Sequence, residues 1–285
     1  MRGTHGNISD ALNVGLSVDT IDDVLDILRG RRIAVLTGAG ISTDSGIPDY
    51  RGAGTVRRTP MTFQQFLGSE ESRARYWAGS HLGWRRFMSA QPNAGHLSLS
   101  ALERRGAVTG VVTQNVDGLH RRAGSNRVVE LHGSMGTVVC VRCGQEFGRG
   151  EIAERLTEAN PWLELPADVV LQPDGDVDTD RLDGFRVPPC PNCGGILKPD
   201  VVFFGELVPR PRFHAAIEVV KRSDALLIAG SSLAVNSGVR LMDHATRRGL
   251  PVVILNRGET KGDQRSTVRL EGGTSELLAA IEARW

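Results

Sequence analysis

Short apolar runs that alternate with helical patterns are the feature of this 285-residue chain that most restricts its fold. Their length, and their lack of polar alternation, are typical of strands buried on both faces. Strands that alternate with helices predict an α/β fold with a parallel sheet covered on both sides. We expect strands at residues 33–37, 108–113, 128–131, 225–229 and 251–255 and helices at 21–28, 62–67, 70–88, 95–105, 151–158 and 275–284.

The charge and composition exclude several broad classes of protein. The 34 basic and 33 acidic residues leave a net charge of +1, which offers no general attraction for nucleic acids or anionic membranes. A hydrophobic content of 40% supports a packed core, and no apolar run approaches the roughly 20 residues that span a bilayer. Because the first ten residues lack the apolar segment of a secretory signal, we expect a cytoplasmic protein.

The four cysteines form two Cys-x-x-Cys pairs, Cys140 with Cys143 and Cys190 with Cys193. Four thiolates in two such turns suit one tetrahedral zinc ion, and four protein ligands leave no open position for catalysis. The 46 residues between the pairs exceed the spacing of a compact zinc ribbon, which indicates an inserted module. A redox pair and buried structural cysteines are the alternatives. The acidic stretch at 174–183 is expected to be a solvated surface.

A glycine-rich segment follows the first predicted strand, at the point where a strand should lead into a helix. Its sequence is Gly38-Ala39-Gly40-Ile41-Ser42-Thr43. Glycines there let backbone amides approach a pyrophosphate, and a helix N-terminus favours the anion. The match to G-x-G-x-x-G is imperfect, because Thr43 occupies the third glycine position. Nucleotide binding and a plain tight turn both remain open.

Small or polar residues also follow the other predicted strands. Asn115 and Asp117, after the second strand, can orient hydroxyls and a ring amide, although Asp117 can equally cap the next helix in an Asx-turn. Residues 230–232 (Gly-Ser-Ser) and 256–258 (Asn-Arg-Gly) can be simple caps or turns. Since the carboxyl ends of parallel strands meet at one edge of a sheet, their coincidence favours a crevice for a dinucleotide.

His132 is the candidate general base. It lies just beyond the strand predicted at 128–131, at the same expected edge as the segments above. The unperturbed pKa of histidine is close to neutrality, which suits proton abstraction. A structural role is the alternative, and His120 is expected to pack within a helix.

Taken together, these motifs resemble the sirtuins, the Sir2 family of NAD-dependent protein-lysine deacylases. The resemblance extends from about residue 33 to residue 280, in family order. It rests on residues 38–42, 46–51, 113–117, 130–133, the two cysteine pairs, 197–206, 230–233 and Asn256. The sequence at 173–177 and the Gly-Ser-Ser at 230–232 are most similar to the class II branch.

The resemblance implies an α/β architecture with a Rossmann-type NAD-binding domain at residues 21–139 and 200–285. A helical insertion is implied at about 52–92 and a zinc-binding module at 140–199. Residues 1–20 are expected to form a flexible arm. NAD is implied as the co-substrate, in the crevice between the domain and the modules, together with one structural Zn²⁺.

The resemblance also implies a set of site residues. His132 is implied as the general base that deprotonates a ribose hydroxyl, with Asn115 and Asp117 positioning the reacting groups. Val201, Val202 and Phe203 are implied as the floor of an acyl-lysine tunnel. Thr274 stands where the closest branch is expected to carry a cysteine. The implied NAD contacts are Gly38, Ala39, Gly40, Ser42, Pro48, Asp49, Tyr50, Arg51, Gln114, Asn115, Val116, Asp117, Gly230, Ser231, Ser232, Asn256, Arg257, Gly258 and Thr274.

The expected activity is removal of an acyl group from protein lysines, with nicotinamide, free lysine and O-acyl-ADP-ribose as products. Acylated-lysine proteins are the expected partners, and a monomer that binds neither nucleic acid nor membrane is expected. Protein mono-ADP-ribosyltransfer from the same NAD site is the alternative, and a silent binding module is a third hypothesis. No Tyr-x-x-Arg occurs in the chain, so preference for succinyl or malonyl groups is not expected.

Overall fold

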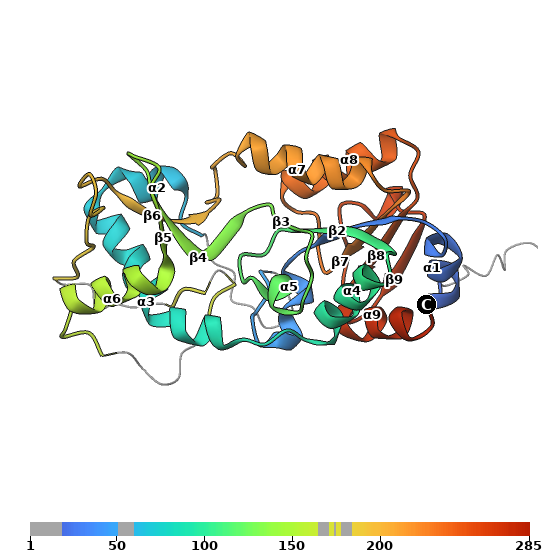
Figure 1. Ribbon diagram of the computed structural model, residues 1–285, viewed down its shortest axis with the longest axis horizontal. Helices are drawn as coiled ribbons and strands as arrows, with labels where there is room; N and C mark the ends of the chain where they lie inside the picture. Colours follow the sequence, from blue (N-terminus) through green and yellow to red (C-terminus); the bar gives the residue numbers. More distant parts are fainter. Residues whose placement is uncertain (1–18, 51–59, 165–170, 174, 178–183) are drawn as a thin grey trace, which may run out of the picture.

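The computed structural model describes residues 19–50, 60–164, 171–173, 175–177 and 184–285 (Figure 1). Its larger sheet has six strands in the order β3-β2-β1-β7-β8-β9, and every neighbouring pair is parallel. This sheet confirms the α/β fold. Its strands are β1 (Ile33–Thr37), β2 (Val108–Thr113), β3 (Val128–Glu130), β7 (Ala225–Ala229), β8 (Val252–Asn256) and β9 (Val268–Glu271).

Helices cover both faces of the larger sheet (Figure 1). One face carries α1 (Ile21–Leu28), α4 (Ala94–Arg104) and α9 (Thr274–Ala283), and the other carries α7 (Arg210–Lys221) and α8 (Asn236–Arg247). A short helix, α5 (Leu119–Arg122), follows β2. Among the described residues, no helix combines the length and apolar character needed to cross a membrane.

Strand β1 shows why an uninterrupted apolar run folds as a central strand. Val35 packs with α1, α4 and α9, whereas Ala34 and Leu36 pack with α7 and α8. Successive side chains of a strand point to opposite faces, so a strand covered on both sides must be apolar at every position. All five residues of β1 are buried.

The observed elements of the larger sheet correspond closely to those predicted, with one strand added, whereas three further strands, Gly133–Cys140, Glu146–Gly148 and Leu197–Val201, were not predicted. The helix at 21–28 and the strands at 33–37, 108–113 and 225–229 have the expected bounds. The sequence analysis missed β9, the edge strand. Arg269 and Glu271 alternate there with Val268 and Leu270, and two apolar residues do not make a recognisable run.

A second, antiparallel sheet lies at the other end of the molecule (Figure 1), in the order β5-β4-β6. Its strands are β4 (Gly133–Cys140), β5 (Glu146–Gly148) and β6 (Leu197–Val201), and its helices are α2 (Phe63–Gly68), α3 (Glu70–Ser89) and α6 (Arg149–Ala159). They share one core, in which Trp77 of α3 packs with Val138 and Ile152. The Trp77 indole also donates to the Leu197 carbonyl at 3.1 Å.

Part of the acidic stretch packs against α3 rather than standing in solvent. The Val177 amide donates to the Gly79 carbonyl at 3.1 Å. A Cβ on Gly79 would lie 2.5 Å from the Val177 carbonyl oxygen, and one on Gly83 would lie 2.0 Å from that of Gly175. The two glycines of α3 therefore make room for this segment, which corrects the expected solvated surface for residues 175–177.

Candidate functional site

The crevice predicted for a ligand lies where the strand order of the larger sheet changes direction. Strands β1 and β7 are neighbours, and from them the chain continues outward to β2 and β3 on one side and to β8 and β9 on the other. Open α/β sheets bind ligands outside the carboxyl ends of strands at such a switch point. The segments 38–42 and 230–232 meet there.

These two segments are packed backbone against backbone. The Gly40 amide donates to the Gly230 carbonyl at 2.9 Å. A Cβ on Gly38 or Gly40 would lie 2.9 Å from that carbonyl oxygen. Gly230 has a φ of +66°, and a Cβ there would lie 2.4 Å from the Ile41 nitrogen. Glycine is therefore required at this edge for the two segments to pack together.

Replacing Gly230 by alanine should lower the free energy of unfolding by about 2–5 kcal/mol, because left-handed strain and overpacking add. Gly249→Ala is the matched control: its φ is +68°, and nothing lies within 4 Å of a Cβ. That control should lose only about 1–2 kcal/mol. Urea denaturation measures both, and equal losses would contradict the close approach.

The chain after Gly38 differs from the prediction. The sequence favours a helix whose N-terminus faces the crevice, but the structure has two short 3₁₀ turns, Ala39–Ile41 and Thr43–Ser45. They end at Gly46, which has a φ of +81°. Turns this short have no sizeable macrodipole, so any attraction for an anion here comes from individual amides rather than a helix terminus.

Asn115, Asp117 and Ser42 form a hydrogen-bond network beside the glycine segment. The Asn115 amide donates to the Gly38 carbonyl at 3.1 Å and to Ser42 Oγ at 3.0 Å. Ser42 Oγ in turn donates to an Asp117 carboxylate oxygen at 2.8 Å, and the other oxygen accepts the Leu119 amide at 2.9 Å. Burial raises the pKa of Asp117. Asp117 thus fulfils the Asx-turn role, and its second oxygen faces Ser42.

His132 lies between β3 and β4. Its Nε2 is 2.8 Å from Ser237 Oγ of α8, and its backbone carbonyl accepts the Val202 amide at 2.8 Å. Burial lowers the pKa of His132 to about 4, while a hydrogen bond to the Gln114 backbone opposes that shift. The ring is therefore neutral near pH 7, the state that a general base needs. Gln114 Oε1 accepts Ser231 Oγ at 2.7 Å, which links His132 to the second glycine segment.

Three buried histidines and the part-buried His132 predict acid-sensitive folding. Burial lowers the pKa values of His81, His96 and His132 to about 4 and that of His120 well below its ordinary value. Below pH 6.5 the unfolded chain binds these protons and the folded chain does not, so stability falls as the pH falls toward 4.

The free energy of unfolding should therefore decrease between pH 7 and pH 5, by on the order of 1–2 kcal/mol for each of these histidines. Urea denaturation at the two pH values measures the decrease. A His81→Gln variant should show a smaller decrease than the wild type, because one titrating ring is gone. A free energy of unfolding that is the same at both pH values would contradict the burial of these rings as neutral groups.

The three residues expected to line an acyl tunnel lie beside His132, and hydrogen bonds and ring contacts fix their position. Val202 bonds to His132 as described, whereas the Phe203 ring lies 5.0 Å from the rings of Phe66 and Tyr76. Lys198 Nζ donates to the Val201 carbonyl at 2.6 Å and to Glu206 at 2.9 Å, and Glu206 accepts the Phe203 amide at 2.9 Å. This buried ion pair fixes the 201–206 segment, and sequence reasoning did not single it out.

Asn256 and Thr274 make contacts at the same edge of the sheet. The Asn256 amide donates to the carbonyls of Arg257 and Gly258, both at 2.9 Å, so its side chain shapes its own turn. Thr274 Oγ1 donates to the Gly40 carbonyl at 3.2 Å and is 4% exposed. Thr274 therefore fastens the start of α9 to the first glycine segment.

The remaining predicted contacts spread outward from this edge. Val116 accepts the Met135 amide at 2.9 Å, and Ser232 accepts the Lys261 amide at 3.1 Å through its carbonyl. Pro48 and Asp49 are half-buried. Tyr50 is 41% exposed, with its ring 6.1 Å from that of Phe204. Arg51 lies outside the described residues, as does almost all of the expected arm at 1–20.

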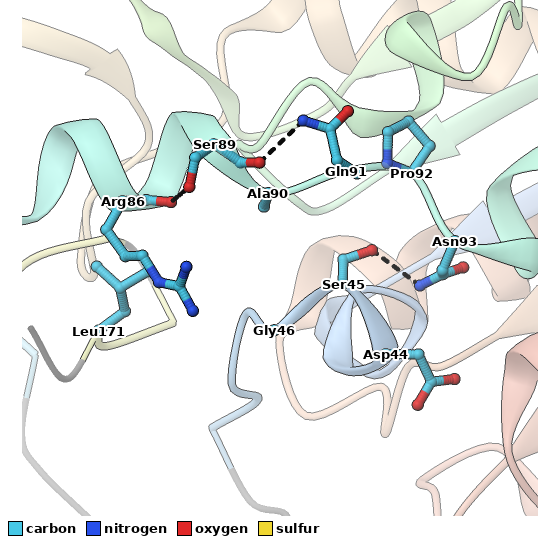
Figure 2. A pocket seen from close by; sticks show the side chains of 10 residues that line it. All are labelled: Asp44, Ser45, Gly46, Arg86, Ser89, Ala90, Gln91, Pro92, Asn93 and Leu171. Carbon is cyan, nitrogen blue, oxygen red and sulfur yellow. Dashed lines mark hydrogen bonds between the residues drawn. The ribbon is translucent and has the colours of Figure 1, made fainter. Parts of the chain in front are cut away.

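A cavity of about 330 Å³ adjoins the second 3₁₀ turn (Figure 2). Figure 2 shows the Arg86 guanidinium of α3 pointing toward Ser45 and Gly46. Asn93 borders the cavity and donates to the Ile41 carbonyl at 2.7 Å and to Ser45 Oγ at 3.0 Å. Sequence reasoning missed this role of Asn93, although its capping box at the start of α4 is a recognisable signal.

The four cysteines converge on one point, as predicted. Their sulfur atoms all lie within 4.8 Å of one another, with 3.5 Å between Cys140 and Cys193 and 3.9 Å between Cys143 and Cys190. Ligands 2.3 Å from a tetrahedral centre lie about 3.8 Å apart, so the set fits one structural zinc ion. Each pair closes with a left-handed glycine, at Gly144 and Gly194.

The fold and site define a class: a Rossmann-type dinucleotide crevice combined with a four-cysteine zinc module. The Sir2 family model matches residues 38–237. The chain belongs to the Sir2 family.

Two curated relatives and one solved structure cover nearly the whole chain. "NAD-dependent protein deacetylase 1" of Mycobacterium avium is 51% identical over 91% of this chain and 93% of its own length. "NAD-dependent protein deacetylase 1" of Streptomyces coelicolor is 55% identical over 92% of this chain and 88% of its own length. The structure titled "Sir2-p53 peptide-NAD+" aligns with a TM-score of 0.74 at 31% identity, covering 93% of this chain and 98% of that one.

Proposed function

We propose that this protein is an NAD-dependent protein-lysine deacylase that yields nicotinamide, free lysine and O-acyl-ADP-ribose. The observation that carries the proposal is a part-buried, neutral His132 joined through Gln114 and Ser231 to the glycine edge of the crevice. The relatives named as NAD-dependent protein deacetylases support it. Gly38, Gly40 and Gly230 let the two segments of that edge meet backbone to backbone, because a Cβ at any of them would clash with the other segment.

Each residue of the site has a role in this proposal. Bound NAD would supply a nicotinamide leaving group and a ribose hydroxyl oxygen that receives the acyl group. The glycine segments 38–40 and 230–232 hold the cofactor, with Asn256, Gly258 and Thr274 closing one end. Asn115 and Asp117 orient the reacting groups, since the Asn115 amide donates and the Asp117 carboxylate is held by Ser42. His132 takes a proton from a ribose hydroxyl through Nε2.

The acylated lysine is proposed to enter beside Val201, Val202 and Phe203. Backbone groups there can pair with an extended peptide in the manner of an added strand. The Val202 amide is already used by His132, so its side chain rather than its N–H faces the substrate. Preference among acetyl, longer aliphatic and bulkier acyl groups depends on the width of this entrance.

The finer assignments are part of the same proposal. They comprise membership of the class II branch and the domain division into 21–139 with 200–285 and 140–199. A monomer in the cytoplasm is also proposed, with acylated-lysine proteins as partners and neither nucleic acid nor membrane involved. The net charge of +1 supports the proposal that neither nucleic acid nor membrane is bound. Four converging free cysteines suit the reducing conditions of the cytoplasm.

A mass-resolved turnover assay tests the proposal. The purified protein is incubated with NAD and peptides that carry acetyl-, succinyl-, long-chain acyl- or lipoyl-lysine. Nicotinamide and O-acyl-ADP-ribose should appear together with deacylated peptide, and succinyl-lysine should be a poor substrate. ADP-ribose attached to protein without deacylated peptide would instead establish mono-ADP-ribosyltransfer. Absence of any NAD consumption would leave the binding-module hypothesis.

A further inference from the structure

A hydroxyl group that no step above uses lies in direct contact with the proposed base. Ser237 Oγ is 2.8 Å from His132 Nε2, and it is the one side-chain hydrogen-bond partner recorded for that ring within the described residues. Ser237 lies in the first turn of α8 and is 7% exposed. The contact is therefore shielded from water, where a hydrogen bond has more influence on a ring nitrogen than at the surface.

The partners of the ring define which nitrogen can accept a proton. Ser237 Oγ is the hydrogen-bond partner of Nε2, so Nδ1 is the nitrogen that makes the hydrogen bond to the Gln114 backbone. A carbonyl oxygen can only accept, which places the hydrogen of the neutral ring on Nδ1. Nε2 then carries the free electron pair, and the Ser237 hydroxyl donates to it.

A hydroxyl can reverse this hydrogen bond when the ring becomes charged. It has one hydrogen to donate and two lone pairs to accept with, and it turns among staggered rotamers at little cost. A substrate hydroxyl first displaces the Ser237 hydrogen from the lone pair of Nε2 and then passes its proton to that nitrogen: an O–H bond breaks, an N–H bond forms and the electron pair stays on the substrate oxygen. The Ser237 oxygen can then accept from the new N–H, a bond strengthened by the charge.

We propose that Ser237 is a positioning residue for the reaction: its hydroxyl holds Nε2 of neutral His132 as the acceptor nitrogen and then accepts a hydrogen bond from that nitrogen once it is protonated. The inference rests on the proposed function only for the identity of the reaction. An imidazole held in one tautomer and supported in both protonation states keeps its ring orientation through the reaction, and the Ser237 hydroxyl alone has to turn.

A Ser237→Ala variant tests the inference, because it removes one oxygen without filling new space. We expect kcat for deacylation to fall about tenfold, the size expected for a lost charge-assisted hydrogen bond, with KM for NAD and for the peptide within about twofold. Ser237→Thr, which keeps a hydroxyl, should recover most of the lost kcat. In the free enzyme, the ¹⁵N chemical shift of His132 Nε2 should move toward that of an acceptor without a hydrogen bond.

Ser223→Ala is the matched control. Ser223 is fully buried, and its hydroxyl bonds the Val219 carbonyl at 2.8 Å and Thr109 Oγ1 at 2.6 Å, at the amino end of β7. It should leave kcat and the His132 shift unchanged. An unaltered kcat and shift in Ser237→Ala would overturn the inference, as would a loss matched by Ser223→Ala or expressed in KM for the peptide. Failure of the wild type to deacylate would contradict the proposed function instead, and the NMR measurement is independent of turnover.

Discussion

Replacing His132 by alanine is expected to reduce deacylation by a factor of about 10²–10⁴, the contribution typical of a positioned general base. His120, in helix α5, is already engaged elsewhere: its Nε2 is bonded to Thr37 Oγ1 at 2.9 Å, and its ring is buried against that of His96. NAD should still bind, because the glycine segments do not depend on the imidazole. Steady-state turnover and NAD titration measure the two effects separately.

The controls for this prediction separate chemistry from packing. His132→Gln fills most of the same volume and should also lose turnover, with a melting temperature close to that of the wild type. His214→Ala removes an exposed ring, 72% accessible, and should change neither property. Product formation at the wild-type rate in His132→Ala would remove this residue from the mechanism.

Cys193→Ser is expected to lose both the zinc ion and the folded second sheet. Structural zinc contributes on the order of 10–16 kcal/mol in small zinc-dependent folds, comparable with the whole stability of a domain. Cys140 ends strand β4 and Cys193 lies in the turn before β6, so the ion clamps these two strands together at one end of that sheet. The zinc content measured by elemental analysis should fall from about one ion per chain to nearly none, and thermal unfolding should begin at a lower temperature.

Val141→Ser is the control within the same knuckle. Val141 is 44% exposed and offers no ligand, so one zinc per chain and a wild-type melting temperature are expected. Treatment of the wild type with a strong chelator should reproduce the Cys193→Ser result. Full zinc content and normal melting in Cys193→Ser would refute the four-thiolate site, and a disulfide recovered from the purified protein would favour the redox alternative.

The fold could be predicted wherever burial alone determines the sequence. Strands β1, β2 and β7 lie inside the sheet and are buried along almost their whole length, so their bounds follow from the largely apolar pattern. Edge strand β9 alternates with charged residues and was missed. The 3₁₀ turns after Gly38 escaped prediction as well, because the close approach of Gly230 that shapes them comes from a segment almost 200 positions away.

The candidate site likewise contains residues that the sequence alone reveals and residues that only the fold brings together. The glycine segments, the cysteine pairs and His132 each have a local signature and were predicted. Ser237 has none: it stands in the first turn of an ordinary helix, and only the fold brings it to His132. The role of Lys198 and Glu206 likewise depends on the fold, since their ion pair holds two backbone groups, the Val201 carbonyl and the Phe203 amide.

The second core limits how far this enzyme can be shortened. Its side chains come from two stretches of chain, the helices α2 and α3 and the segment from β4 to β6. Strand β2 of the larger sheet lies between these two stretches in the sequence. Cutting out the cysteine segment alone would strip the cover from Phe66 and Trp77, which are fully buried. A truncated form would expose that apolar surface and aggregate. Neither stretch is an autonomous unit, so grafting this module onto another protein requires transplanting both.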